Sequence, residues 1–86
     1  MLIKKVVLDT AVEEKIFEKH SVGKEEIEEI LLMDEPKCFK ARNDRYMGIG
    51  VMQRFITVIF EYADGIAMIV TAYPSSESQI RLYHRK

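Results

Sequence analysis

The segment that most constrains the fold is a pair of apolar runs joined by Asp64-Gly65. Before this dipeptide, residues 54–62 alternate between two faces, as in a half-buried strand. After it, residues 66–73 are almost wholly apolar, as expected of a strand at the centre of a sheet. Asp-Gly between two such runs is a strong hairpin signal. We therefore expect these residues to form two neighbouring antiparallel strands.

Three shorter segments also have strand-like sequences. Residues 2–8 are rich in β-branched side chains, and residues 37–41 form a weaker pattern. Residues 46–52 place Gly48 and Gly50 on one face of a strand. Glycine inside a strand indicates a bulge, or the close approach of another backbone or a ligand.

Two amphipathic helices are expected between the first of these strands and Pro36. Thr10 and Glu13 form a capping box, which predicts a helix that begins near Ala11. Gly23 is expected to cap a second helix, which ends before Pro36 because the residue before proline avoids helical angles. The expected apolar stripes contain Val12, Ile16, Phe17 and His20 in the first helix and Ile27, Ile30 and Leu31 in the second.

The carboxyl-terminal tail has two interpretations. Ser76 with Gln79 fits a capping box and predicts a short helix that carries Ile80 and Tyr83, whereas a short strand is the alternative. The expected order is β-α-α-β-β-β followed by this tail. We predict an α+β fold in which a two-helix hairpin packs on one face of a twisted antiparallel sheet of about four strands. A single domain is expected over residues 1–86.

Length and composition exclude several classes of protein. No apolar run approaches the roughly 20 residues that span a bilayer, and no signal peptide is visible, so we expect a cytoplasmic protein. Cys38 is the only cysteine, which excludes an intrachain disulfide. Cys38, His20 and His84 are too few and too scattered for a zinc site, and we expect neither a metal nor a cofactor. Because so short a chain buries little of its surface, a partner chain or a homodimer is expected.

Charge is distributed unequally along the chain. Residues 1–36 contain ten acidic residues and five lysines, whereas residues 37–86 contain four acidic residues and eight lysines and arginines. All five arginines lie in the second half. One interpretation is a local basic surface that binds phosphates. The other is a solvated sheet face whose charges pair with the acidic helices.

A basic and aromatic cluster is the first candidate for an RNA site. Arg42, Arg45 and Arg54 are expected on adjacent strands near one surface, where guanidinium groups match phosphate oxygens. Lys40 adds positive charge, and Tyr46 suits the stacking of a splayed base. Ordinary strand surface is the alternative.

His20 and Tyr73 are candidates for acid–base chemistry. Histidine titrates near neutrality, which suits a catalytic acid or base, whereas a partly buried structural role is the alternative for His20. Tyr73 stands at the end of the last long strand and suits a proton donor or a stacking platform, with core packing as the alternative. Metal-independent RNA cleavage needs a proton acceptor, a proton donor and cations, which Arg, Tyr, His and Lys supply.

Several of these segments resemble the BrnT-like toxins. The similar segments are residues 19–22 with 25–29, 45–50, 57–60 with Asp64-Gly65, 69–72, and the closing Glu77 and Tyr83. Tyr73-Pro74 stands where such chains carry a basic pair, and this ending looks more like that of a related, uncharacterised RelE-like group. BrnT-like toxins belong to the RelE superfamily of type II toxin–antitoxin ribonucleases. The resemblance implies a metal-independent endoribonuclease, acting on RNA such as ribosome-associated mRNA and neutralised by a separately encoded antitoxin.

We therefore predict a toxin whose catalytic residues are Arg45, Arg54, Tyr73 and His20. The residues predicted to bind RNA are Lys40, Arg42 and Tyr46. This hypothesis requires the arginines to converge on one concave surface. The alternative is a non-catalytic RelE-like module that binds RNA or a protein partner. A third interpretation is a structural homo-oligomer joined through an edge strand.

Overall fold

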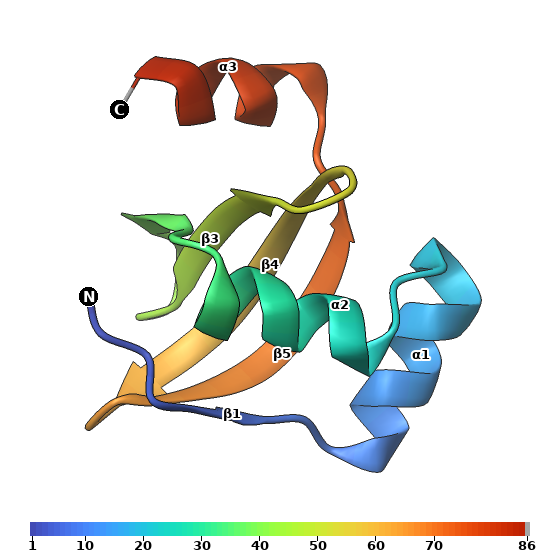
Figure 1. The fold of residues 1–86 in the computed structure, drawn as a ribbon. Helices are drawn as coiled ribbons and strands as arrows, with labels where there is room; N and C mark the ends of the chain where they lie inside the picture. Colours follow the sequence, from blue (N-terminus) through green and yellow to red (C-terminus); the bar gives the residue numbers. More distant parts are fainter. Residues whose placement is uncertain (86) are drawn as a thin grey trace.

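A five-stranded sheet with helices on both faces makes up the part of the chain that the computed structural model describes, residues 1–85 (Figure 1). The elements are β1 (Lys5–Val7), α1 (Thr10–His20), α2 (Lys24–Glu28), η1 (Glu29–Met33), β2 (Lys37–Lys40), β3 (Tyr46–Val51), β4 (Phe55–Ala63), β5 (Ile66–Pro74) and α3 (Glu77–Arg85). η1 is a single π-helical turn that continues directly from α2.

The strand order is β1-β5-β4-β3-β2. β2, β3, β4 and β5 pair antiparallel with one another in sequence, whereas β1 lies parallel to β5. The predicted α+β fold is confirmed, but the described sheet has five strands instead of about four and is mixed instead of antiparallel. The additional strand is β2, whose sequence pattern is weak but whose four residues all pair with β3.

The predicted hairpin at Asp64-Gly65 joins β4 and β5. Both residues have positive φ angles, 50° and 82°, as the two-residue type I′ turn requires. The pairing register shifts between Ile59 and Phe60, which makes Val70 the extra residue of a bulge. β4, and not β5, is the central strand of the described sheet.

The core lies between the sheet and α1, α2 and η1. Its members include Ile16, Ile27, Ile30 and Leu31 from the helices and Ile56, Val58 and Phe60 from β4. The predicted stripes are confirmed at these helical positions, but Phe17 is 61% exposed because it faces away from the sheet. The cap of α1 is Asp9 instead of Thr10, since the Asp9 carboxylate accepts a hydrogen bond of 3.0 Å from the backbone N–H of Ala11.

η1 approaches the sheet most closely at Gly50. A Cβ atom there would lie 2.9 Å from both Ile30 Cγ2 and Asp34 Oδ2. The Asp34 carboxylate accepts a 2.9 Å hydrogen bond from the backbone N–H of Val51. The predicted close approach at this glycine is therefore made by η1 and the residue that follows it.

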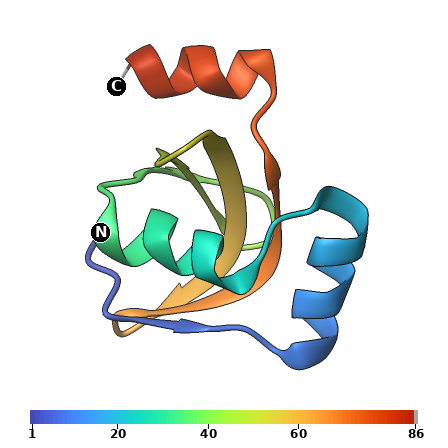
Figure 2. The ribbon, with the colours of Figure 1, turned by 45° about the vertical axis from the view of Figure 1, so that its right-hand side comes forward.

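α3 lies apart from the other helices, at the top of the molecule in Figures 1 and 2. Ser76 N–H donates to Gln79 Oε1 at 2.9 Å, and Gln79 N–H donates to Ser76 Oγ at 3.2 Å. This is the predicted capping box, so the helix interpretation of the tail is confirmed and the strand interpretation is wrong. At the other end of α3, the Lys37 ammonium donates to the Tyr83 carbonyl oxygen at 3.0 Å.

Candidate active site at the end of strand β5

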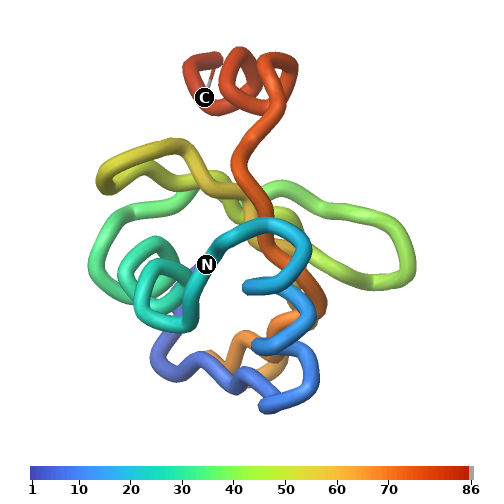
Figure 3. The backbone as a smooth tube through the Cα atoms, turned by 90° about the vertical axis from the view of Figure 1, so that its right-hand side faces the viewer, coloured from blue at the N-terminus to red at the C-terminus, as the bar shows by residue number. Residues whose placement is uncertain are grey.

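The structure brings His20 and Tyr73 together. His20 is the last residue of α1, and the centroid of its ring lies 5.8 Å from that of Tyr73 in a tilted arrangement. β1 pairs only with residues 66–68, so α1 flanks the later residues of β5 (Figure 3). Both side chains are half-buried, which fixes their positions and leaves part of each ring in contact with solvent.

A hollow of about 220 Å³ lies beside this pair, between α1 and β5. Lys15, Lys19 and His20 line its helical side, and Val70 and Thr71 line its strand side. Lys15 and Lys19 are one helical turn apart, so both ammonium groups can reach one ligand. Because its described lining residues include no carboxylate, the hollow is cationic and suits a phosphate.

The Tyr73 hydroxyl is oriented by Gln79 of α3. The Gln79 Nε2 amide group donates to Tyr73 Oη at 3.1 Å. Gln79 Oε1 accepts from the backbone N–H of Ser76 and from the hydroxyl of the buried Thr57, at 2.9 and 3.1 Å. These two donors fix the orientation of the amide. Since Tyr73 Oη accepts a hydrogen bond from Gln79, its own proton is available to a ligand.

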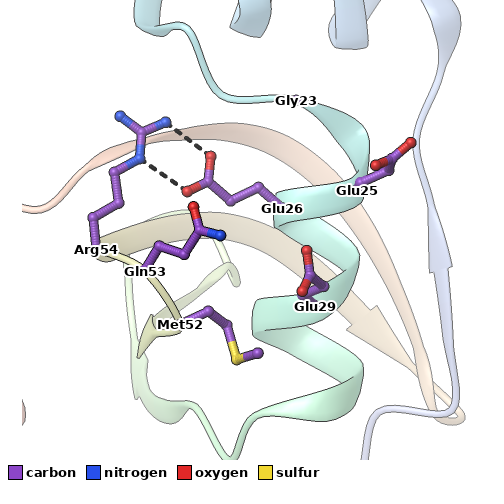
Figure 4. A pocket seen from close by; sticks show the side chains of 7 residues that line it. All are labelled: Gly23, Glu25, Glu26, Glu29, Met52, Gln53 and Arg54. Atoms are coloured by element: carbon purple, nitrogen blue, oxygen red, sulfur yellow. Dashed lines mark hydrogen bonds and ion pairs between the residues drawn. The ribbon is translucent and has the colours of Figure 1, made fainter.

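Arg54 lies at the same end of the sheet but is held by Glu26 (Figure 4). The guanidinium donates to both carboxylate oxygens, at 2.8 and 2.9 Å, and Nη2 also donates to the Ser21 carbonyl oxygen at 2.9 Å. The hydrogen bond with Glu26 raises the pKa of Arg54 above its ordinary value. Arg54 therefore fixes the loop that follows His20, and its paired donors are engaged by protein.

Arg45 and Arg42 lie at the opposite end of β3 from Arg54. The six residues of β3 lie between them and span roughly 20 Å, at about 3.3 Å per residue. Arg45 Nε lies 3.6 Å from Glu61 Oε2 and is buried without a hydrogen bond. The prediction of a single convergent arginine surface is therefore wrong, because Arg45 and Arg54 flank one strand at its two ends.

Lys40 and Tyr46 accompany Arg45. They pair with each other where the β2–β3 hairpin closes, and Lys40 is exposed. The Tyr46 ring stacks on Phe60 and meets Tyr62 edge-on, with centroid distances of 6.0 and 6.2 Å. Its aromatic surface is thus partly engaged by the core.

The described residues offer no grouping of His, Cys, Asp or Glu side chains that could hold a metal ion. None of the helices within residues 1–85 is both long enough and apolar enough to cross a membrane.

Comparison with solved structures matches a ribonuclease toxin of Brucella abortus, BrnT. The alignment has a TM-score of 0.69 at 23% sequence identity and covers 85% of this chain and 97% of that chain. The chain has the BrnT fold. No protein-family model and no curated protein matches the sequence. The resemblance inferred from sequence is thus confirmed for the fold.

Within the BrnT fold, the four predicted catalytic residues divide into two groups. His20, Tyr73 and Arg54 share one end of the sheet, and Arg45 occupies the other. Sequence reasoning missed Lys15, Lys19 and Gln79 as members of the site. The four-residue spacing of the two lysines on one helix is a signal that could have identified them. Gln79 has no such signal, because its sequence context indicates only a helix cap and its contact with Tyr73 depends on the position of α3.

Proposed function

We propose that the protein is a ribonuclease toxin of the BrnT type that cleaves RNA in the hollow between α1 and β5. The BrnT fold supports the class of activity. The observation that carries the site is that His20 lines a hollow with two lysines, and no carboxylate is among its described lining residues, while the ring of Tyr73 lies beside that of His20. An acid–base pair beside a phosphate-binding surface is what cleavage of a phosphodiester requires.

The reaction assigned to this site is attack by the ribose 2′-oxygen on the adjacent phosphorus. His20 accepts the 2′-hydroxyl proton as the new P–O bond forms, and the bond to the 5′-oxygen breaks. Tyr73 donates a proton to that leaving oxygen, while Lys15 and Lys19 neutralise the non-bridging oxygens. The products are a 2′,3′-cyclic phosphate and a 5′-hydroxyl.

The arginines have different roles in this proposal. Arg54 is a positioning residue, because its bonds to Glu26 and Ser21 hold the loop next to His20. Arg45 and Arg42, with Lys40 and Tyr46, are proposed to contact RNA at some distance from the scissile bond. Phosphate contacts of this kind add affinity and orient the strand.

The test is incubation of the purified protein with RNA in EDTA. We expect metal-independent cleavage that leaves 2′,3′-cyclic phosphate ends. His20→Ala and Tyr73→Phe should each slow it by roughly 100-fold or more, the usual size of an acid–base contribution. His84→Ala and Tyr62→Phe are matched controls, because His84 contacts Phe55 and Tyr83 and the Tyr62 hydroxyl bonds Leu2, all outside the hollow. Equal loss in the controls would contradict the assignment.

A non-catalytic module is the second candidate, favoured by the engagement of Arg54 with Glu26 and Arg45 with Glu61. Salt-dependent RNA binding without cleavage would support it and contradict the nuclease proposal. The toxin proposal further predicts a cytoplasmic protein whose expression arrests growth. Co-expression of an antitoxin encoded beside it should restore growth, and normal growth without an antitoxin would oppose the proposal.

A further inference from the structure

A strip of exposed apolar side chains runs along the outer side of α2 and η1. We name it the methionine strip, and its members are Leu2, Leu32, Met33 and Met52. These side chains are between 41% and 77% exposed. Leu32 lines one hollow with Leu2 and a second with Met33, which places the three side by side. Met52 lines a third hollow, which shares Glu25 and Glu29 with the second, so Met52 lies near the other three across these two glutamates.

An acidic rim borders the methionine strip. It consists of Glu25, Glu28, Glu29 and Glu35, which line the same hollows. Figure 4 shows Glu25, Glu29 and Met52 around one of them. Arg54 is the only cationic side chain among the described residues that line these hollows, and Glu26 neutralises it. The surface therefore combines exposed apolar side chains with a net negative charge.

The π-helical turn explains how η1 presents this surface. Asp34 N–H donates to the Glu29 carbonyl oxygen at 2.9 Å, a bond between residues five apart that widens the turn. Ile30 and Leu31 are buried in the core, while Leu32 and Met33 face solvent. These two side chains are therefore not part of the core of the described residues. A contiguous exposed apolar patch with a polar border marks an interaction site.

We propose that the methionine strip binds a basic amphipathic helix of a partner protein. Unbranched methionine side chains adapt their shape to an incoming apolar face. An amphipathic helix buries such a face in an apolar groove, and its lysines or arginines would meet the carboxylates of the rim. The same carboxylates repel nucleic acid and anionic lipid. The strip shares no residue with the hollow at His20, so this proposal does not rest on the ribonuclease activity.

The test uses a synthetic 18-residue peptide that has leucine on one helical face, lysine on the other and one tryptophan. The protein contains no tryptophan, so peptide fluorescence reports binding without background. Leu32→Gln with Met33→Gln should weaken binding about tenfold or more, as for truncated anchors. Replacement of Glu25, Glu28 and Glu29 by glutamine should also weaken it about tenfold and reduce its salt dependence.

The control variant is Phe17→Gln, which removes an equally exposed apolar side chain from α1 and should not change binding. A peptide with glutamate in place of lysine should not bind. Binding that is unchanged by the strip variants, or equal for both peptides, would overturn the proposal. So would a dimer in sedimentation that the Leu32→Gln, Met33→Gln variant dissociates, because the occupant would then be a second copy. RNA cleavage should be unaffected in all these variants, which separates this test from that of the active site.

Discussion

Gly50 offers the sharpest test of the close approach between η1 and the sheet. Its missing side chain leaves room for Ile30 and for the Asp34 carboxylate, each of which would lie 2.9 Å from an added Cβ atom. Neither neighbour can retreat freely, since Ile30 is buried and Asp34 is hydrogen-bonded to the Val51 N–H. Gly50→Ala must therefore displace both.

The size of the effect follows from three contributions. Loss of the hydrogen bond to a charged acceptor costs about 1.5–3 kcal/mol, and overpacking of the Ile30 side chain costs about 1–3 kcal/mol. The reduced entropy of the unfolded chain offsets about 0.4–1 kcal/mol of this. We expect a net loss of about 1.5–5.5 kcal/mol in the free energy of unfolding. For 86 residues the total is about 4–13 kcal/mol.

Urea unfolding followed by circular dichroism measures this loss, and the midpoint should fall by roughly 2 M. Gly48→Ala is the matched control, because its nearest neighbours, Phe60 and Leu31, lie at 3.2 and 3.4 Å, and we expect a loss of about 1 kcal/mol. The double variant Asp34→Ala, Gly50→Ala should be destabilised by less than the sum of the two single variants. The difference in the free energy of unfolding should be at least about 1 kcal/mol. If the Gly50→Ala protein were within about 0.5 kcal/mol of the parent, the close approach of Ile30 and Asp34 to Gly50 would not constrain the fold.

The same titration checks three further changes. Arg54→Ala should lower the free energy of unfolding by about 1 kcal/mol, because it removes the exposed ion pair with Glu26, and the loss should be smaller in 1 M salt. An equal loss at low and high salt would argue against an ionic origin. Thr57→Val should lower the free energy of unfolding by about 1–2 kcal/mol, because it removes the hydrogen bond to Gln79. Since the Gln79 amide is then less well oriented, RNA cleavage should also slow, and unchanged cleavage would show that Gln79 does not contribute to the site. Gly23→Ser should add about 0.5 kcal/mol as a better cap, since nothing lies within 4 Å of its Cβ position; destabilisation would contradict this.

Most features that depend on neighbouring residues were predictable from sequence, although the cap of α1 is Asp9 and not the predicted Thr10. The Asp64-Gly65 turn, the cap at Gly23 and the Ser76–Gln79 box each involve residues within a few positions of one another, and the structure contains all three. The alternation in residues 54–62 correctly separated the two faces of β4, because side-chain direction in a strand depends only on parity.

Features that depend on long-range packing were not predictable. Whether Arg54 and Arg45 face one ligand depends on the length of β3 and on the position of Glu26, which are decided by tertiary structure. The contact between His20 and Tyr73 arises because β1 is short and leaves α1 beside β5. The π turn at η1 likewise has no local signature in residues 29–33.

The parallel pairing of β1 with β5 has a consequence for synthesis. Lys5 finds its partner in Ile66, so the first strand has no sheet to join until most of the chain has left the ribosome. Closing so long a loop is entropically costly and comes late. His20 and Tyr73 meet only when β5 is in place, and a nascent chain lacking that strand would lack the contact on which the proposed site depends.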